Sequence, residues 1–249
     1  RQNSTQRGRD GWTLTLEMPC YLSVITHADD RRLREEIYLS FVTRASDLGP
    51  FAGRWDNSAT LLDIVRLRHE LARALGFSNY AERSLATKMA KSTDQVVTFL
   101  KDLAARTLPA ARRELAELRA FAQESVGLTT LEAWDIPYAS EKLKRARFII
   151  DQEELKPYFP TPQVLQGLFK LVQRLYGLRV VAQSPVAAWH PQVEFFSIYD
   201  SSNELRGRFY LDLYARPNKR GGAWMADFLS RSHLGSNLQN PVAFITCNF

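Results

Sequence analysis

The chain has 249 residues, of which 45% are hydrophobic and 24% charged, and its formal net charge is +6. This composition excludes an intrinsically disordered chain, and no apolar run reaches the roughly 20 residues that a membrane helix needs, so we predict a globular protein with no membrane partner. Only two cysteines are present, Cys20 and Cys247, which is too few for a disulfide scaffold and favours a reducing, cytoplasmic compartment.

Helical spacing dominates residues 1–177, where apolar residues recur three and four apart between Gly or Pro residues. Two shorter helices are predicted over 30–46 and 137–149. The clearest helix follows the N-cap residues Asp56-Asn57-Ser58, whose side-chain oxygens can accept first-turn N–H groups. We expect it to end at Gly76, because glycine adopts the left-handed conformation of a helix C-terminus.

The next long helix begins with a capping box formed by Ser92 and Gln95. Pro109 falls inside the continuing apolar pattern, and we expect it to kink or break the helix, since proline lacks the N–H that the helix interior requires. The pattern then continues to a stop near Gly127.

The last predicted helix starts at the pair Thr161-Pro162 and ends at Gly177. Beyond it, short runs of β-branched and aromatic residues alternate with turn-forming residues, which predicts strands. Strands over 193–199 and 205–214 form a plausible hairpin, and 242–249 offers a third. The fold class is therefore mainly α with a small β-sheet near the C-terminus.

Basic residues occur in short clusters scattered along the chain, such as 31–34, 142–147 and 219–220. A nucleic-acid-binding protein more typically concentrates its cations on one element or interleaves them with an aromatic platform. We therefore expect no nucleic-acid partner, and charge-driven binding of nucleic acid is kept only as a third hypothesis.

Hydrolytic chemistry has no recognisable motif in this chain. Zinc peptidases of the helical type use His-Glu-x-x-His, which places two imidazoles on one helix face beside a glutamate that activates water. The nearest segment, His69-Glu70-Leu71-Ala72-Arg73, has an arginine at the second ligand position and cannot chelate zinc. The acidic pair Asp29-Asp30 is expected to cap a helix rather than to catalyse. Neither a catalytic residue nor a metal ligand is assigned to this chain.

A series of segments carries a more specific pattern. The longest is Gly207–Met225, which reads GRFYLDLYARPNKRGGAWM. The others, in chain order, are 44–47, 55–58, 67–72, 84–90, 134–138, 157–160 and 241–249. Together they resemble the thimet oligopeptidase family of zinc metallopeptidases, particularly its bacterial members, in the family's order and over essentially the whole chain.

The resemblance implies a two-lobed, helical, zincin-like peptidase whose channel admits short unstructured peptides. It also implies a zinc ion in the full-length enzyme, held by a His-Glu-x-x-His helix and a later glutamate downstream of Phe249. On this interpretation 1–177 is a helical region and 178–249 is the β-containing part of the catalytic lobe, truncated before the zinc-binding helix. Because the chain starts at Arg1 and stops directly after an apolar run, we expect an internal fragment that contains no zinc and is inactive alone, and the oligomeric state stays open.

Substrate positioning is the role that this piece could retain. Gly221, Gly222 and Ala223 would let a peptide backbone approach closely, although the glycines could equally form a tight turn. Tyr214 could line the channel or pack in a core. Lys219 and Arg220 could attract the C-terminal carboxylate of a peptide, or belong to a solvated loop.

The main alternative is a non-catalytic helical module that binds peptides or a partner protein. Continuation of the reading frame past Phe249 into His-Glu-x-x-His would exclude it, and a stop codon there would favour it.

Overall fold

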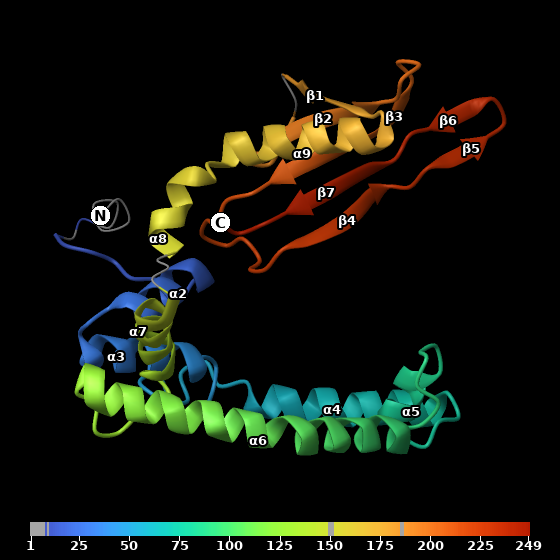
Figure 1. Cartoon of the computed structure of the whole chain (residues 1–249). Coiled ribbons are helices and arrows are strands. Elements are labelled where there is room, and N and C mark those ends of the chain that lie inside the picture. Colours follow the sequence, from blue (N-terminus) through green and yellow to red (C-terminus); the bar gives the residue numbers. More distant parts are fainter. Residues whose placement is uncertain (1–7, 9, 149–151, 185–186) are drawn as a thin grey trace. The chain divides into compact units, whose positions relative to one another are not determined.

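The computed structural model describes residue 8 and residues 10–148, 152–184 and 187–249, and it confirms a mainly helical chain with a small sheet near the C-terminus (Figure 1). Its contacts divide it into two compact units. The first contains most of the residues up to Phe148, and the second contains α9 and all the strands.

Helices build the first unit. In chain order they are α2 (Met18–His27, of which 18–20 group with the second unit), α3 (Arg31–Val42), α4 (Ser58–Ala74), α5 (Tyr80–Leu85), α6 (Thr93–Val126) and α7 (Ile136–Phe148). Asp30 caps α3 as expected, since its carboxylate accepts the backbone N–H groups of Arg32 and Leu33 at 2.9 and 3.3 Å. The helix predicted to reach residue 46 ends earlier, at Val42, with Thr43 as its C-cap; Ala45, just beyond, takes a positive φ of 53°. The predicted end of α7 at Ile149 lies outside the described residues.

The two long helices begin and end at the signals read from the sequence. Asp56 accepts the backbone N–H of Ser58 at 2.9 Å, and Gly76 takes a φ of +83° just beyond α4. Ser92 accepts the N–H of Gln95 at 3.1 Å, and Gly127 ends α6 with a φ of +76°. We expected Pro109 to kink or break the helix, and the break was wrong, because α6 runs uninterrupted through it. A proline removes one backbone donor, and the many remaining bonds of a long helix outweigh that loss.

A small core holds α6 to α7. Leu118 and Ala122 of α6 pack against Ala139 of α7, with Leu131 and Leu143 around them. By contrast, the apolar side chains of α4 stay largely exposed in the described part of the chain.

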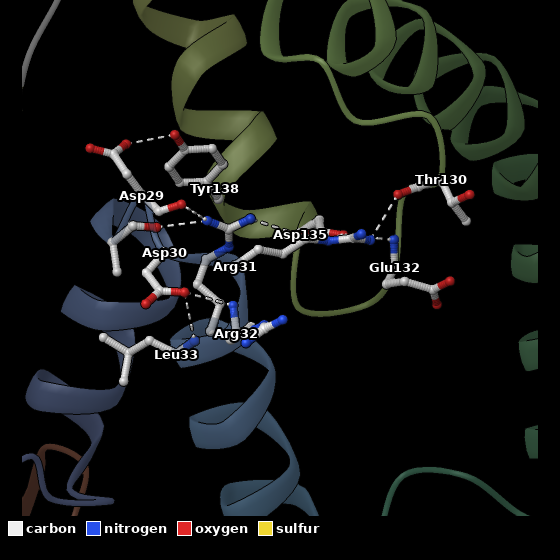
Figure 2. A network of polar contacts seen from close by, with 11 residues as sticks. Asp29, Asp30, Arg31, Arg32, Leu33, Thr130, Glu132, Asp135 and Tyr138 are labelled. Carbon is white, nitrogen blue, oxygen red and sulfur yellow. Dashed lines mark hydrogen bonds and ion pairs between the residues drawn. The ribbon is translucent and has the colours of Figure 1, made fainter.

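An ion-pair network ties α3 to the segment that leads into α7 (Figure 2). The carboxylate of Asp135, fully buried, accepts from the Arg31 guanidinium at 2.7 Å and from that of Arg34 at 2.8 Å. Arg31 also donates to the carbonyl oxygen of Thr130 at 3.0 Å. This network anchors residues 130–135 to the start of α3.

The second unit combines α9 with the strands. Its elements are α8 (Gln152–Leu155), a 3-10 turn (Lys156–Tyr158), α9 (Thr161–Tyr176), β1 (Arg179–Gln183), β2 (Glu194–Tyr199), β3 (Leu205–Asp212), β4 (Trp224–Leu229), β5 (Ser232–Leu234), β6 (Asn237–Gln239) and β7 (Val242–Thr246). As predicted, α9 starts at Thr161 and ends at Gly177, and Pro160 occupies its N-cap. The three predicted strands correspond to β2, β3 and β7, and the sequence reading missed β1, β4, β5 and β6.

Five strands form one sheet in the order β1-β2-β3-β7-β4, in which β3 and β7 are parallel and the other neighbours antiparallel. The short strands β5 and β6 pair at the tip of the hairpin that joins β4 to β7 (Figure 1). In this order β1 and β4 are the two edges of the sheet.

The two faces of this sheet differ. On one face, Phe196, Phe209 and Leu211 pack against Leu165 and Phe169 of α9. The opposite face carries an aromatic cluster in which neighbouring ring centroids lie 4.4–5.5 Å apart: Trp189, Phe195, Tyr210, Phe228 and Phe244. Because side chains alternate along a strand, Asp212 shares this second face with Tyr210.

Candidate functional site

The predicted substrate-binding residues gather in one loop, residues 213–223, which leads from β3 to β4. Gly221, Gly222 and Ala223 directly precede Trp224, the first residue of β4. Since β4 is an edge of the sheet, one side of this strand is not covered by a neighbouring strand in the described chain. A peptide that paired with this edge would pass beside the loop.

The two glycines are not equivalent. Gly222 has a φ of +97°, a conformation that side chains rarely adopt, so the turn itself accounts for glycine there. Gly221 lies outside that region of φ, and a Cβ added to it would meet no atom within 4 Å. The described fold therefore does not require glycine at 221, whereas close approach of another backbone would.

Tyr214 and Tyr210 have different surroundings. Tyr210 packs within the aromatic cluster, with its ring centroid 4.4 Å from that of Phe195. The side chain of Tyr214, in contrast, is 37% exposed at the start of the loop. Of the two alternatives given for Tyr214, core packing describes its neighbour Tyr210, whereas Tyr214 itself is accessible to a ligand.

Asp212 forms the polar centre of this region. Its carboxylate accepts two hydrogen bonds from the Arg216 guanidinium, at 2.6 and 2.7 Å, and one from Lys219 Nζ at 2.9 Å. The indole N–H of Trp189 donates a further bond at 3.0 Å. The hydrogen bonds from Arg216, followed by those from Lys219 and Trp189, lower the pKa of Asp212 far below its usual range, although burial opposes them. Asp212 is therefore an ionised and paired carboxylate rather than a candidate general base.

Lys219 is part of this arrangement and not of a solvated surface. Its ammonium group donates to the carboxylate of Asp212, to the Asp212 carbonyl at 3.1 Å and to the Tyr214 carbonyl at 2.8 Å, and its side chain is only 5% exposed. It is thus badly placed to attract a peptide carboxylate. The guanidinium of Arg220 lies 5.3 Å from the ring centroid of Trp224 and remains the loop's accessible cation.

Asn248 holds the other end of the loop. Its side-chain N–H group donates to the carbonyl oxygens of Arg220 and Gly222, at 3.0 and 2.6 Å. Sequence reasoning missed both Asp212 and Asn248. The available signal was a carboxylate at the end of an apolar strand, followed within eight positions by Arg216, Lys219 and Arg220.

The described residues do not fit a zinc site, because they include no group of three or more His, Cys, Asp or Glu side chains that could hold a metal ion. The near-miss segment of α4 has a structural explanation: His69 is exposed, and Glu70 accepts from the Arg66 guanidinium at 2.8 Å. The pair Asp29-Asp30 is structural as well, since Asp30 caps α3 and Asp29 accepts from the Tyr138 hydroxyl at 2.6 Å (Figure 2).

An apolar groove of about 1330 Å³ lies on the α9 side of the sheet. Side chains of α9 such as Leu168 and Val172 line it together with Phe209 and Ile245 of the strands. Its lining contains neither a histidine nor a carboxylate. The groove is therefore mainly a packing surface, and its ionisable side chains are those of Lys156, Arg206, Arg208 and Cys247.

Across the described residues, no helix combines the length and apolar character that crossing a bilayer requires.

Comparison with known proteins gives consistent results. The chain is 54% identical over 241 residues to oligopeptidase A of Escherichia coli (strain K12). This alignment covers 96% of this chain and 35% of the length of that protein. It is 48% identical over 250 residues to oligopeptidase A of Haemophilus influenzae, and the alignment covers 100% of this chain and 37% of that protein. A probable cytosolic oligopeptidase A of Arabidopsis thaliana is 40% identical over 245 residues, and the alignment covers 95% of this chain and 34% of that protein. The chain thus spans about a third of the length of these curated relatives.

The sequence model of peptidase family M3 matches residues 24–249, nearly the whole chain. This match and the relatives confirm the resemblance that the segments of the sequence carry. The chain belongs to peptidase family M3.

Proposed function

We propose that this chain is part of a zinc-dependent oligopeptidase of the cytoplasm, and that it supplies the sheet edge along which a short peptide substrate lies. The relatives named oligopeptidase A support the activity. The two-lobed architecture with an enclosed channel, of which 178–249 would form part of the catalytic lobe, belongs to the same proposal.

Zinc would activate water and polarise the scissile carbonyl in such an enzyme. The described residues do not form its site, so no hydrolytic step is assigned to them. Their contribution is to bind and orient the peptide.

The observation that carries the proposal is the position of Gly221 beside the β4 edge. An extended peptide that adds as a strand is held by backbone hydrogen bonds, which recognise many sequences alike. Such pairing brings two backbones within about 5 Å, and small residues next to the strand leave room for this approach. No atom of the fold lies within 4 Å of a Cβ built at Gly221, and its backbone conformation does not require glycine. It lies three residues before Trp224, the first residue of β4.

The test is the variant Gly221→Ala in the complete protein that contains this chain. The added methyl group meets nothing within 4 Å of the fold, so stability should not change, whereas the KM for a fluorogenic short peptide should rise about tenfold, equivalent to about 1.4 kcal/mol. The matched control is Gly167→Ala in α9, where a Cβ also meets no atom and the KM should stay at the wild-type value. An unchanged KM in Gly221→Ala would refute the proposed binding edge.

A second measurement separates the enzyme from the alternative of a binding module. The complete protein should cleave the peptide and lose this activity to a zinc chelator, while the 249-residue chain with added zinc should leave the peptide intact. Binding of the peptide by the complete protein without cleavage would favour the non-catalytic module.

A further inference from the structure

We infer that Asp212 and Asn248 are positioning residues that hold the 213–223 loop in one conformation. The loop around Gly221 then has its binding conformation before the peptide arrives. This inference rests on the proposed function and deepens it. It assigns the buried charges beside the site a role in substrate affinity, not in the chemical step.

The first half of the loop is held by Asp212. Its partners Arg216 and Lys219 follow it by only four and seven residues, so the ion pairs close a short stretch of chain on itself. The fork of Arg216 bonds both carboxylate oxygens, a geometry that fixes direction as well as distance.

Lys219 tightens this closure. An ammonium group has three N–H donors, and the three acceptors within reach are two oxygens of Asp212 and the carbonyl of Tyr214. With its side chain only 5% exposed, water cannot readily replace these partners. The backbone from Tyr214 to Lys219 is therefore ordered before any ligand arrives.

The second half is held by Asn248, which follows β7 and bonds the carbonyls on both sides of Gly221. Both attachment points are themselves fixed to the sheet. The N–H of Cys247 donates to the Asp212 carbonyl at 2.8 Å, and the N–H of Phe249 donates to the Leu213 carbonyl at 3.0 Å. The loop is thus fastened at its beginning and its end to the parallel pair β3 and β7.

Fastening of this kind acts on binding. A flexible loop must become ordered when the peptide binds, and the conformational entropy that it loses weakens the affinity for the peptide. Releasing the loop should therefore raise KM while the rate of the bound complex, kcat, changes little. A purely structural role would instead lower the fraction of active enzyme and leave KM unchanged.

The sharpest variant is Asn248→Asp in the complete protein. It keeps the size of the side chain but replaces the N–H donors with a carboxylate, which faces the carbonyls of Arg220 and Gly222. We expect KM to rise about fivefold to tenfold with kcat within about twofold of wild type. Asn237→Asp, the same change at an exposed position of β6, should leave both parameters unchanged.

Asp212→Asn gives a second, independent reading, because it removes the charge that holds Arg216 and Lys219. It should raise KM at least as much as Asn248→Asp and should also lower the stability of the second unit, which contains the loop. If this variant fails to fold, Asn248→Asp still decides the inference.

Hydrogen exchange of the loop separates this inference from the proposed function, since it needs no peptide. Amides of 213–223 should exchange faster in Asn248→Asp than in wild type and Asn237→Asp. If wild type cleaves no peptide, the proposed function fails whatever the loop does. If wild type cleaves peptides but Asn248→Asp shows unchanged exchange, or unchanged KM, the positioning role is overturned.

Discussion

Both units of the molecule bury an aspartate between two cations, but the partners come from different distances along the chain. Asp135 in the first unit pairs with Arg31 and Arg34, which precede it by 104 and 101 residues. Asp212 in the second unit pairs with Arg216 and Lys219, which follow it by four and seven. Both carboxylates accept hydrogen bonds from two cations, and the clearest difference between the two groups is the sequence separation.

That difference assigns the two groups different roles. The Asp135 network joins α3 to the approach of α7, so the tertiary arrangement of the first unit depends on it. The Asp212 network shapes a single loop on a sheet that its own apolar core already holds together. Loss of Asp135 should therefore unfold helices, and loss of Asp212 should release a loop.

The largest expected effect is that of Asp135→Ala. The guanidinium of Arg34, whose side chain is 1% exposed, would stay buried without its carboxylate, and breaking such a pair costs about 3–5 kcal/mol. Native-state hydrogen exchange of the complete protein in urea should show this loss for the amides of α3 and α7. A loss below about 1 kcal/mol would contradict the tethering role.

Two controls belong to this measurement. Asp212→Asn should leave exchange in α3 and α7 unchanged. Acid provides the other, because the pKa of Asp135 is lowered: burial, its largest single influence, raises the pKa, but the hydrogen bonds from Arg31, Arg34 and the Glu132 amide together outweigh it. A carboxyl group with a lowered folded-state pKa stabilises the fold above its unfolded pKa of about 3.9, and this contribution is lost as the pH falls through the folded value. The advantage of wild type over Asp135→Ala should thus shrink below about pH 4.

The smallest expected effect is that of Glu70→Gln on α4, an exposed counterpart to the buried aspartates. Glu70 pairs with Arg66 one helical turn away, and both side chains are more than half exposed. Such a pair contributes about 0.3–0.5 kcal/mol, so the urea midpoint should hardly move and peptide cleavage should stay at the wild-type rate. A large loss of cleavage would show that the His69-Glu70 segment takes part in the chemistry after all.

Local signals explain how much of the fold could be predicted from the sequence. Asp30, Ser92 and the glycines at 76, 127 and 177 act on their own helix ends, so their effects can be read without the tertiary structure. Pro109 misled because its local rule is overruled by the length of α6. Cap signals therefore predicted helix ends better than the proline predicted a break.

The candidate site was predictable only in part. Gly221 and Gly222 stand out in the sequence, but β4 does not, because its register shifts between Asp227 and Leu229 and its apolar residues do not alternate cleanly. Its position at the edge follows from pairing with β7, and the parallel pairing of β7 with β3 is likewise non-local. The roles of the loop's charges needed the folded loop, since spacing alone does not show which cation turns inward.

The most direct measurement of the central claim is hydrogen exchange of the complete protein, kept in chelator so that it cannot hydrolyse, with and without a short unstructured peptide. Peptide addition to the sheet should protect amides of 221–229, while β1, the opposite edge of the same sheet, should exchange as before. Protection of β1 instead of β4, or of neither edge, would contradict the proposal that the substrate pairs with β4 of this chain.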